Sequence, residues 1–191
     1  MHLTEGEFYH VFNRGNNRQR IFMRNGNYEF FIKKIETHVL PVCDILAWCL
    51  MPNHFHFLIH ANSKSTPTIK DGSFERQNFS QAIKQLLSSY TKAINKQEGR
   101  TGSLFQQKTK AICLSRDSDY LFTVFNYIHQ NPVKAGLTQK LEDWAFSSFS
   151  EYIKQNKFSL CNKEISTKYI GLNMERFYDE SYKVINFDMK F

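Results

Sequence analysis

Hydrophobic residues along the chain follow two periods, and each period predicts its own set of elements. Short continuous or alternating hydrophobic runs, bounded by Gly, Pro, Asn or Asp, predict strands. These runs fall at residues 7–15, 42–50, 54–60 and 102–115. Stretches in which hydrophobic residues recur every three to four positions predict helices. They fall at residues 28–40, 78–97 and 117–131, and the last is expected to end at Asn131 because Pro132 follows.

The order of these elements, β-α-β-β-α-β-α, predicts an α+β fold. A ferredoxin-like βαββαβ unit forms an antiparallel sheet with its two helices on one face. The helix at 117–131 is then left for the open face. Residues 61–77 are polar and contain Pro67 and Gly72, so we expect a loop there. A main domain over residues 1–152 would be followed by an extension, 153–191, of unknown role.

The charge of the chain suggests a class of partner. Lys and Arg outnumber Asp and Glu by 25 to 18, and the net charge of +7 favours polyanions through counterion release. A basic protein with no nucleic-acid role is the alternative. No apolar stretch approaches the roughly 20 residues of a membrane span. No signal peptide is visible, and the four cysteines have no metal-ligand spacing. These features predict a cytoplasmic protein with reduced thiols and no membrane partner.

The strand at 54–60 carries three histidines among hydrophobic residues. Because side chains alternate along a strand, His54, His56 and His60 share one face, and the intervening Phe residues form the core face. Two imidazoles at positions i and i+2 lie about 7 Å apart at the backbone and can bind one divalent ion. The alternative is that they are ordinary polar residues on a solvated face. His60 shares this face and has no assigned role.

The helix at 117–131 ends in a second group of polar residues, YIHQN. Tyr127 and Asn131 are four residues apart, so they share a face with a rise of about 6 Å between them. The negative end of the helix dipole would favour a cation near Asn131. Alternatively, Tyr127 belongs to the buried stripe of the helix and Asn131 is a polar cap.

Together, these two motifs resemble those of the single-tyrosine HUH transposases, and most closely the REP-associated tyrosine transposases. The segments AWCLMPNHFHFLIH and YIHQNPVKAGL carry the resemblance, with further matches at YHVFNRGNNRQRIF, GSLFQQ and AFSSFSEY. It covers residues 7 to about 152 and implies that residues 1–152 are a catalytic domain of this type.

The resemblance implies a metal-dependent transposase that cleaves and rejoins single-stranded DNA near hairpins. His54, His56 and Asn131 would bind Mg²⁺ or Mn²⁺, and Tyr127 would form a 5′-phosphotyrosine link with the DNA. Two imidazoles and an amide oxygen suit such a cation better than structural Zn²⁺. Two alternatives stay open: a non-catalytic hairpin-binding protein of the same fold, and a replication or plasmid-nicking endonuclease with the same chemistry.

Basic and amide side chains in two segments are the expected DNA contacts. One segment is the loop after the first strand, the other is the strand near residue 110, and one lysine follows the tyrosine helix. The residues are Asn13, Arg14, Arg18, Arg20, Gln106, Lys108, Lys110 and Lys134. The expected partner is single-stranded or hairpin DNA, bound by a monomer or a homodimer.

Overall fold

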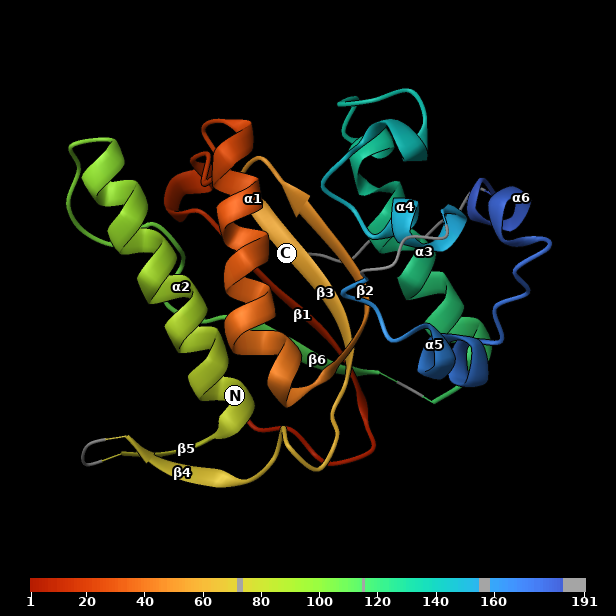
Figure 1. The fold of residues 1–191 in the computed structure, drawn as a ribbon, viewed down its shortest axis with the longest axis horizontal. Coiled ribbons are helices and arrows are strands. Elements are labelled where there is room, and N and C mark those ends of the chain that lie inside the picture. The colour runs from red at the N-terminus through yellow and green to blue at the C-terminus, as the bar shows by residue number, and fades with distance from the viewer. Residues whose placement is uncertain (72–73, 115, 155–158, 184–191) are drawn as a thin grey trace.

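A four-stranded antiparallel sheet forms the centre of the computed structural model, which describes residues 1–71, 74–114, 116–154 and 159–183 (Figure 1). Its strands are β1 (Phe8–Arg14), β2 (Asp44–Met51), β3 (His54–His60) and β6 (Lys110–Leu114). Their order is β2-β3-β1-β6, and each neighbouring pair is antiparallel. β1 and β2 therefore run in the same direction on either side of β3, which confirms the predicted ferredoxin-like topology.

Two helices, α1 (Asn25–Lys34) and α2 (Asn78–Gln97), cover one face of this sheet (Figure 1). The Phe31 ring of α1 lies 5.5 Å from the Phe55 ring of β3, and Tyr90 of α2 packs edge-on against Phe31 at 4.9 Å. The Phe side of β3 is therefore the core face, as predicted. α1 ends earlier than expected, because the chain continues as a π turn, η2 (Ile35–Val39), and a 3-10 turn, η3 (Leu40–Val42).

The third helix, α3 (Ser118–Lys134), packs on the opposite face of the sheet, against β2 and β3. Its first turn is capped by the Asp117 carboxylate, which accepts a hydrogen bond from the Tyr120 backbone N–H at 2.9 Å. The prediction that the tyrosine-bearing helix lies on the face left open by α1 and α2 is confirmed.

The predicted end of this helix at Asn131 is wrong. Pro132 lies inside the last turn, where its ring removes a single intrahelical hydrogen bond. The helix continues to Lys134 and is terminated by Gly136, whose φ is +67°, with hydrogen bonds from Gly136 N to Val133 O and from Leu137 N to Pro132 O, both 2.9 Å. Lys134 is consequently helical. It lies seven residues after Tyr127 and therefore on the same face of α3.

A hairpin of β4 (Thr68–Asp71) and β5 (Phe74–Gln77) lies within residues 61–77, where a loop was expected. The error has a physical cause: these strands pair mainly through their backbones and carry polar residues, so they lack a hydrophobic period. The Gln77 side chain anchors the hairpin by bonding both the N–H and the carbonyl of Leu3, at 2.6 and 2.9 Å.

Short elements near the C-terminus pack around α3 and the β2 edge of the sheet. They are η4 (Leu141–Asp143), α4 (Phe149–Ile153), α5 (Lys163–Ile170) and α6 (Phe177–Ser181). The Trp48 indole of β2 donates to Glu151 of α4 at 2.8 Å, and Asn162 N donates to the Ile45 carbonyl at 2.8 Å. The division into 1–152 and 153–191 stays a prediction.

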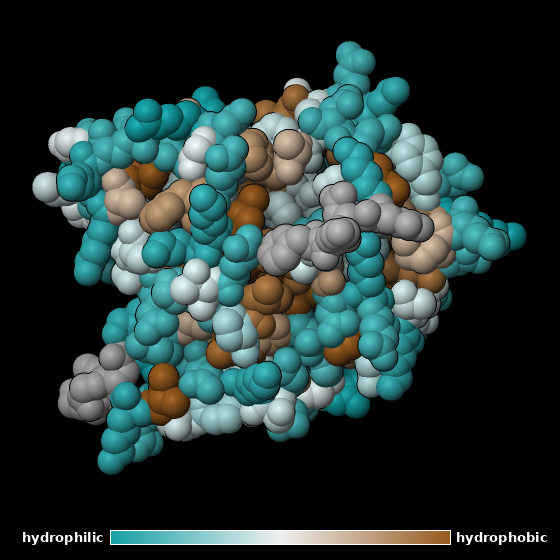
Figure 2. Space-filling model, viewed as in Figure 1, coloured by the Kyte–Doolittle hydropathy of each residue, from teal (hydrophilic) through white to brown (hydrophobic). Residues whose placement is uncertain are grey.

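The surface seen in Figure 2 is largely hydrophilic, with hydrophobic residues gathered near the middle of this face between α1 and α5. Within the described ranges, none of the helices combines the length and hydrophobicity that a membrane span requires.

Candidate active site

The two predicted metal-binding histidines lie on the face of β3 that α3 covers. The His56 side chain is completely buried, and His54 is partly buried at the end of the strand. The centroids of the two imidazoles are 4.9 Å apart, with their planes perpendicular. The interpretation of His56 as a polar residue on a solvated face is therefore excluded.

The helix α3 brings Tyr127 directly against this pair. Its ring packs edge-on against His56, with centroids 5.9 Å apart, and the side chain is 5% exposed. Burial was also expected if Tyr127 belonged only to the hydrophobic stripe of the helix. Here, however, its neighbours are imidazoles. The Lys134 ammonium lies 5.6 Å from the centre of the Tyr127 ring.

A third histidine, His10 of β1, completes the cluster and was not predicted as a site residue. It is fully buried, and its ring stacks on His56 with centroids 5.0 Å apart and planes 12° apart. His10 Nε2 and His56 Nδ1 are joined by a 2.8 Å hydrogen bond, and Tyr127 packs edge-on against His10 at 6.2 Å. In the sequence, His10 lies in the alternating segment EFYHVFN and in the matching segment YHVFNRGNNRQRIF, but no spacing there distinguishes it as a site residue.

A second residue that the sequence reasoning missed, Asn53, fixes the tautomer of His54. The Asn53 Nδ2 donates to the Arg18 carbonyl at 3.3 Å, so its Oδ1 faces His54 Nδ1, 2.6 Å away. That oxygen accepts only, and the proton must therefore lie on Nδ1 of His54. The lone pair of His54 is then on Nε2, the nitrogen that could bind a metal.

Burial keeps all three imidazoles neutral. It lowers the pKa of His10 to about 3 and that of His54 to about 4, the latter assisted by the charge of Arg14. The pKa of His56 is also well below its usual value, because of burial and then of the two neighbouring histidines. Since only neutral imidazole has a lone pair for a metal, the site is in the binding-competent protonation state at neutral pH.

Two observations bear on whether these residues fit a divalent cation. Imidazoles at neighbouring positions around one ion, with nitrogens about 2.1 Å from it, have centroids roughly 4.5–5 Å apart, close to the value observed for His54 and His56. The described residues contain no group of three or more His, Cys, Asp or Glu side chains arranged to hold a metal. A third protein ligand would therefore be of another type, such as an amide oxygen. Asn131 of α3 is half-buried and donates from Nδ2 to the Tyr127 carbonyl at 2.8 Å, so its Oδ1 is the atom that could serve.

The basic loop after β1 is attached to the turn that precedes His54. Gly15 N donates to the Asn53 carbonyl and Ile21 N to the Pro52 carbonyl, both at 2.8 Å. Arg14 is paired with His54 across β1 and β3, so both side chains lie on the α3 face of the sheet. Arg18 and Arg20 are exposed on the loop. Backbone hydrogen bonds thus hold the loop that carries Arg18 and Arg20 against the turn that precedes His54.

Five of the predicted DNA-binding residues meet in one small pocket at the end of β1. They are Asn13, Arg14, Gln106, Lys108 and Lys110, joined by Phe12. Asn13 is buried and bonds within the protein, from Nδ2 to Thr109 Oγ1 at 2.9 Å and to the Gln106 carbonyl at 3.1 Å. The Lys110 ammonium lies 5.7 Å from the Phe12 ring centre. That these residues bind DNA stays a prediction.

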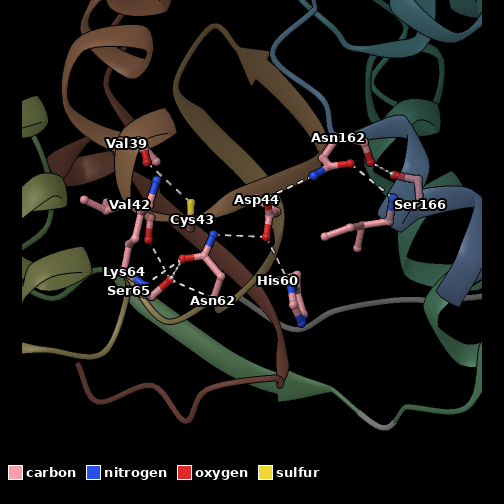
Figure 3. A network of polar contacts seen from close by, with 11 residues as sticks. Val39, Val42, Cys43, Asp44, His60, Asn62, Lys64, Ser65, Asn162 and Ser166 are labelled. Carbon is pink, nitrogen blue, oxygen red and sulfur yellow. Dashed lines mark hydrogen bonds and ion pairs between the residues drawn. The ribbon is translucent and has the colours of Figure 1, made fainter.

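His60, at the other end of β3, takes part in a separate network (Figure 3). Its Nδ1 lies 3.2 Å from Asp44 Oδ2, which also accepts a hydrogen bond from Asn62 at 3.0 Å. The second oxygen of Asp44 accepts from Asn162 at 3.0 Å. These hydrogen bonds lower the pKa of Asp44, with His60 as the largest contribution. The network joins β2, β3, the segment after β3 and the start of α5.

Comparison with known proteins gives one relative in sequence and one in fold. No protein-family model matches the sequence. A Haemophilus influenzae protein named "Putative REP-associated tyrosine transposase" is 25% identical over 111 residues, which are 58% of this chain and 61% of that protein. The chain thus aligns with about three fifths of the relative's length. A solved structure of a REP-associated tyrosine transposase bound to a REP hairpin has the same fold, with a TM-score of 0.58, 20% identity, and coverage of 84% of this chain and 87% of that one. In sequence and in fold, the chain is therefore similar to the REP-associated tyrosine transposases, as its two motifs indicate.

Proposed function

We propose that this chain cleaves and rejoins single-stranded DNA through Tyr127, in a metal-dependent reaction next to a hairpin. The observation that supports it is the packing of Tyr127 against His56 and His10, 5.9 and 6.2 Å between ring centroids. A helix and a strand about 70 residues apart in sequence meet at these side chains. A protein that only binds DNA would not need a phenol beside two neutral imidazoles.

A divalent cation is part of the proposal. His54 and His56 would hold Mg²⁺ or Mn²⁺ through Nε2, with the amide oxygen of Asn131 as third ligand. When bound, the cation would polarise the scissile phosphate and help to orient it. Because two of the three ligands are imidazoles, we expect Mn²⁺ to bind more tightly than Mg²⁺.

Tyr127 would act as the nucleophile. Its phenol oxygen attacks phosphorus, the bond from phosphorus to the 3′ oxygen breaks, and the phenol proton leaves to solvent or a nearby base while the 3′ oxygen gains one. The product is a 5′-phosphotyrosine and a free 3′-OH. One phosphoester replaces another, so rejoining needs no nucleotide hydrolysis. The ammonium of Lys134 beside the Tyr127 ring would favour negative charge on the phenol or the phosphate.

The remaining cationic residues would hold the strand in place. Arg14 lies opposite His54 across the sheet, and Lys108 and Lys110 line the adjoining pocket. Phosphate contacts of this kind position a nucleic acid without reading its sequence. We expect the protein to act in the cytoplasm, as a monomer or a homodimer, on hairpin-containing DNA like that bound by the structural relative.

Incubation with end-labelled, hairpin-containing single-stranded DNA and Mg²⁺ or Mn²⁺ tests the proposal. A denaturation-resistant protein–DNA adduct should form, and Tyr127→Phe should abolish it while leaving hairpin binding within about threefold. Tyr120→Phe removes a phenol from the same helix and is the matched control, so it should still form the adduct. Adduct formation by Tyr127→Phe would refute the assignment. Hairpin binding by the unmodified chain without any adduct would instead support the non-catalytic alternative.

A further inference from the structure

A groove of about 800 Å³ runs between α2 and the chain segment that leads to β6. Figure 1 shows this segment leaving the end of α2 and returning along it toward the sheet. The groove is separate from the Tyr127 cluster and lies on the side of the sheet that α1 and α2 cover. Ile83, Leu87 and Phe105 are its principal apolar lining residues.

Both walls of the groove present cations and hydrogen-bond donors. On α2, Lys84, Ser88 and Lys92 follow one another at intervals of four residues, so they form a single row along the helix. The two lysines are exposed and about 12 Å apart along the helix axis. The opposite wall adds the exposed Lys108 and the amide of Gln106. No Asp or Glu is among the described residues that line the groove.

This lining suits a phosphate backbone. Lys, Ser, Thr and Gln side chains are the usual ligands of DNA phosphates, and they carry no sequence information. An unpaired strand would also need aromatic faces on which its bases can stack. Phe105 is the one aromatic residue among the described lining residues, and it is 4% exposed. The groove therefore favours paired DNA, whose bases are already stacked on each other.

The groove adjoins the small pocket at the end of β1. Gln106 and Lys108 line it and also line the pocket that contains Arg14 and Lys110. We propose that the α2 groove binds the phosphate backbone of a base-paired stem, while the unpaired strand next to the stem passes over Gln106 and Lys108 to Tyr127. This proposal rests on the proposed function, because it assigns one part of the same hairpin DNA, the paired stem, to the α2 groove.

The test measures binding in chelator-containing buffer, so that no chemistry contributes. Lys84→Glu combined with Lys92→Glu reverses two charges on the α2 row. Its matched control, Lys33→Glu combined with Lys64→Glu, makes the same net change at exposed lysines outside the groove. Fluorescence polarisation with a labelled hairpin and with an unpaired strand of equal length gives the two dissociation constants, and thermal unfolding checks that both variants fold.

The groove variant should bind the hairpin about tenfold or more weakly, and the slope of log Kd against log salt should fall by roughly two. Its affinity for the unpaired strand should change by less than about threefold. In the control variant, the affinities for the hairpin and for the unpaired strand should both stay within the same limit. An equal loss for both DNAs, or equal losses in both variants, would overturn the proposal. If the Tyr127 adduct never forms but the groove variant still loses hairpin affinity selectively, the groove stands and the catalytic proposal fails.

Discussion

The hydrogen bond between His10 and His56 gives the most specific prediction about the candidate metal site. His56 can bind a cation through Nε2 only if its proton lies on Nδ1. In that tautomer, Nδ1–H donates to Nε2 of His10, 2.8 Å away. In the reverse arrangement His10 donates, and Nε2 of His56 carries the proton. Cation binding through Nε2 of His56 would therefore require His10 as the acceptor, and His10 would act as a positioning residue for that tautomer of His56.

Replacing His10 by leucine removes this acceptor from a site that is completely buried. Loss of the hydrogen-bond partner of a metal-binding histidine typically costs 10- to 100-fold in metal affinity, or about 1.4–2.7 kcal/mol. The buried N–H of His56 would also lose its partner, which costs about 1–3 kcal/mol of stability. His10→Gln retains an acceptor oxygen at about the position of Nε2, so it should recover most of the affinity.

Isothermal titration of the metal-free protein with Mn²⁺ measures this effect, with urea unfolding to report stability. His129 provides the control: it is 1% exposed and bonds Ser148 at 2.7 Å, away from the histidine cluster. His129→Leu should lower stability but leave Mn²⁺ affinity unchanged. Equal Mn²⁺ affinity in His10→Leu and the unmodified protein would refute the tautomer argument. An equal loss in both variants would mean that affinity only follows stability.

Two further predictions concern the loop after β1 and the buried histidines. A Cβ on Gly15 would lie 2.3 Å from the Gln19 carbonyl oxygen, so Gly15→Ala should cost about 1–3 kcal/mol in urea unfolding and weaken DNA binding in a polarisation assay. Gly26→Ala of α1, where a Cβ meets nothing within 4 Å, should be neutral or slightly stabilising. Burial lowers the pKa of His10 and of His129 to about 3, so below pH 6.5 the unfolded chain gains a proton at each while the folded chain does not. Between pH 6 and pH 4, each of these histidines should therefore lower the free energy of unfolding of the cation-free protein by up to about 1.4 kcal/mol for every pH unit. A free energy of unfolding, measured with urea, that stays constant over this range would contradict the prediction.

The sequence was sufficient to predict the sheet and the histidine pair of β3, because both depend on the local spacing of hydrophobic and polar residues. The alternation of His and Phe along β3 determines which face each side chain takes, and the helical spacing of α2 determines its buried stripe. The order of elements then leaves few topologies. Assigning the tyrosine helix to the remaining face of the sheet placed Tyr127 on the same side as His56. Their contact itself depends on tertiary packing.

His10 and Asn53 could not be recognised in the same way. Neither is part of a spaced motif, and each acts through one partner. His10 reaches His56 diagonally, since the register of β1 and β3 pairs it with Leu58. A shift of that register by one residue would turn His10 toward the other face of the sheet. The interaction is therefore a property of strand register, which depends on the whole sheet and not on the residues near His10.

The two ends of β3 show why residue type and face do not determine a role. His54 and His60 lie on the same face of one strand, but the register places Arg14 beside the first and Asp44 beside the second. Burial, and then the charge of Arg14, lowers the pKa of His54 and leaves a neutral nitrogen that could bind a metal. The carboxylate next to His60 accepts its hydrogen bond, and Asn62 and Asn162 then extend the link to two other parts of the chain (Figure 3). The residue paired across the sheet thus helps to separate a candidate ligand from a structural histidine. The Asp44 pairing depends on the register shift between Ile45 and Ala47, without which Asp44 would not lie opposite His60.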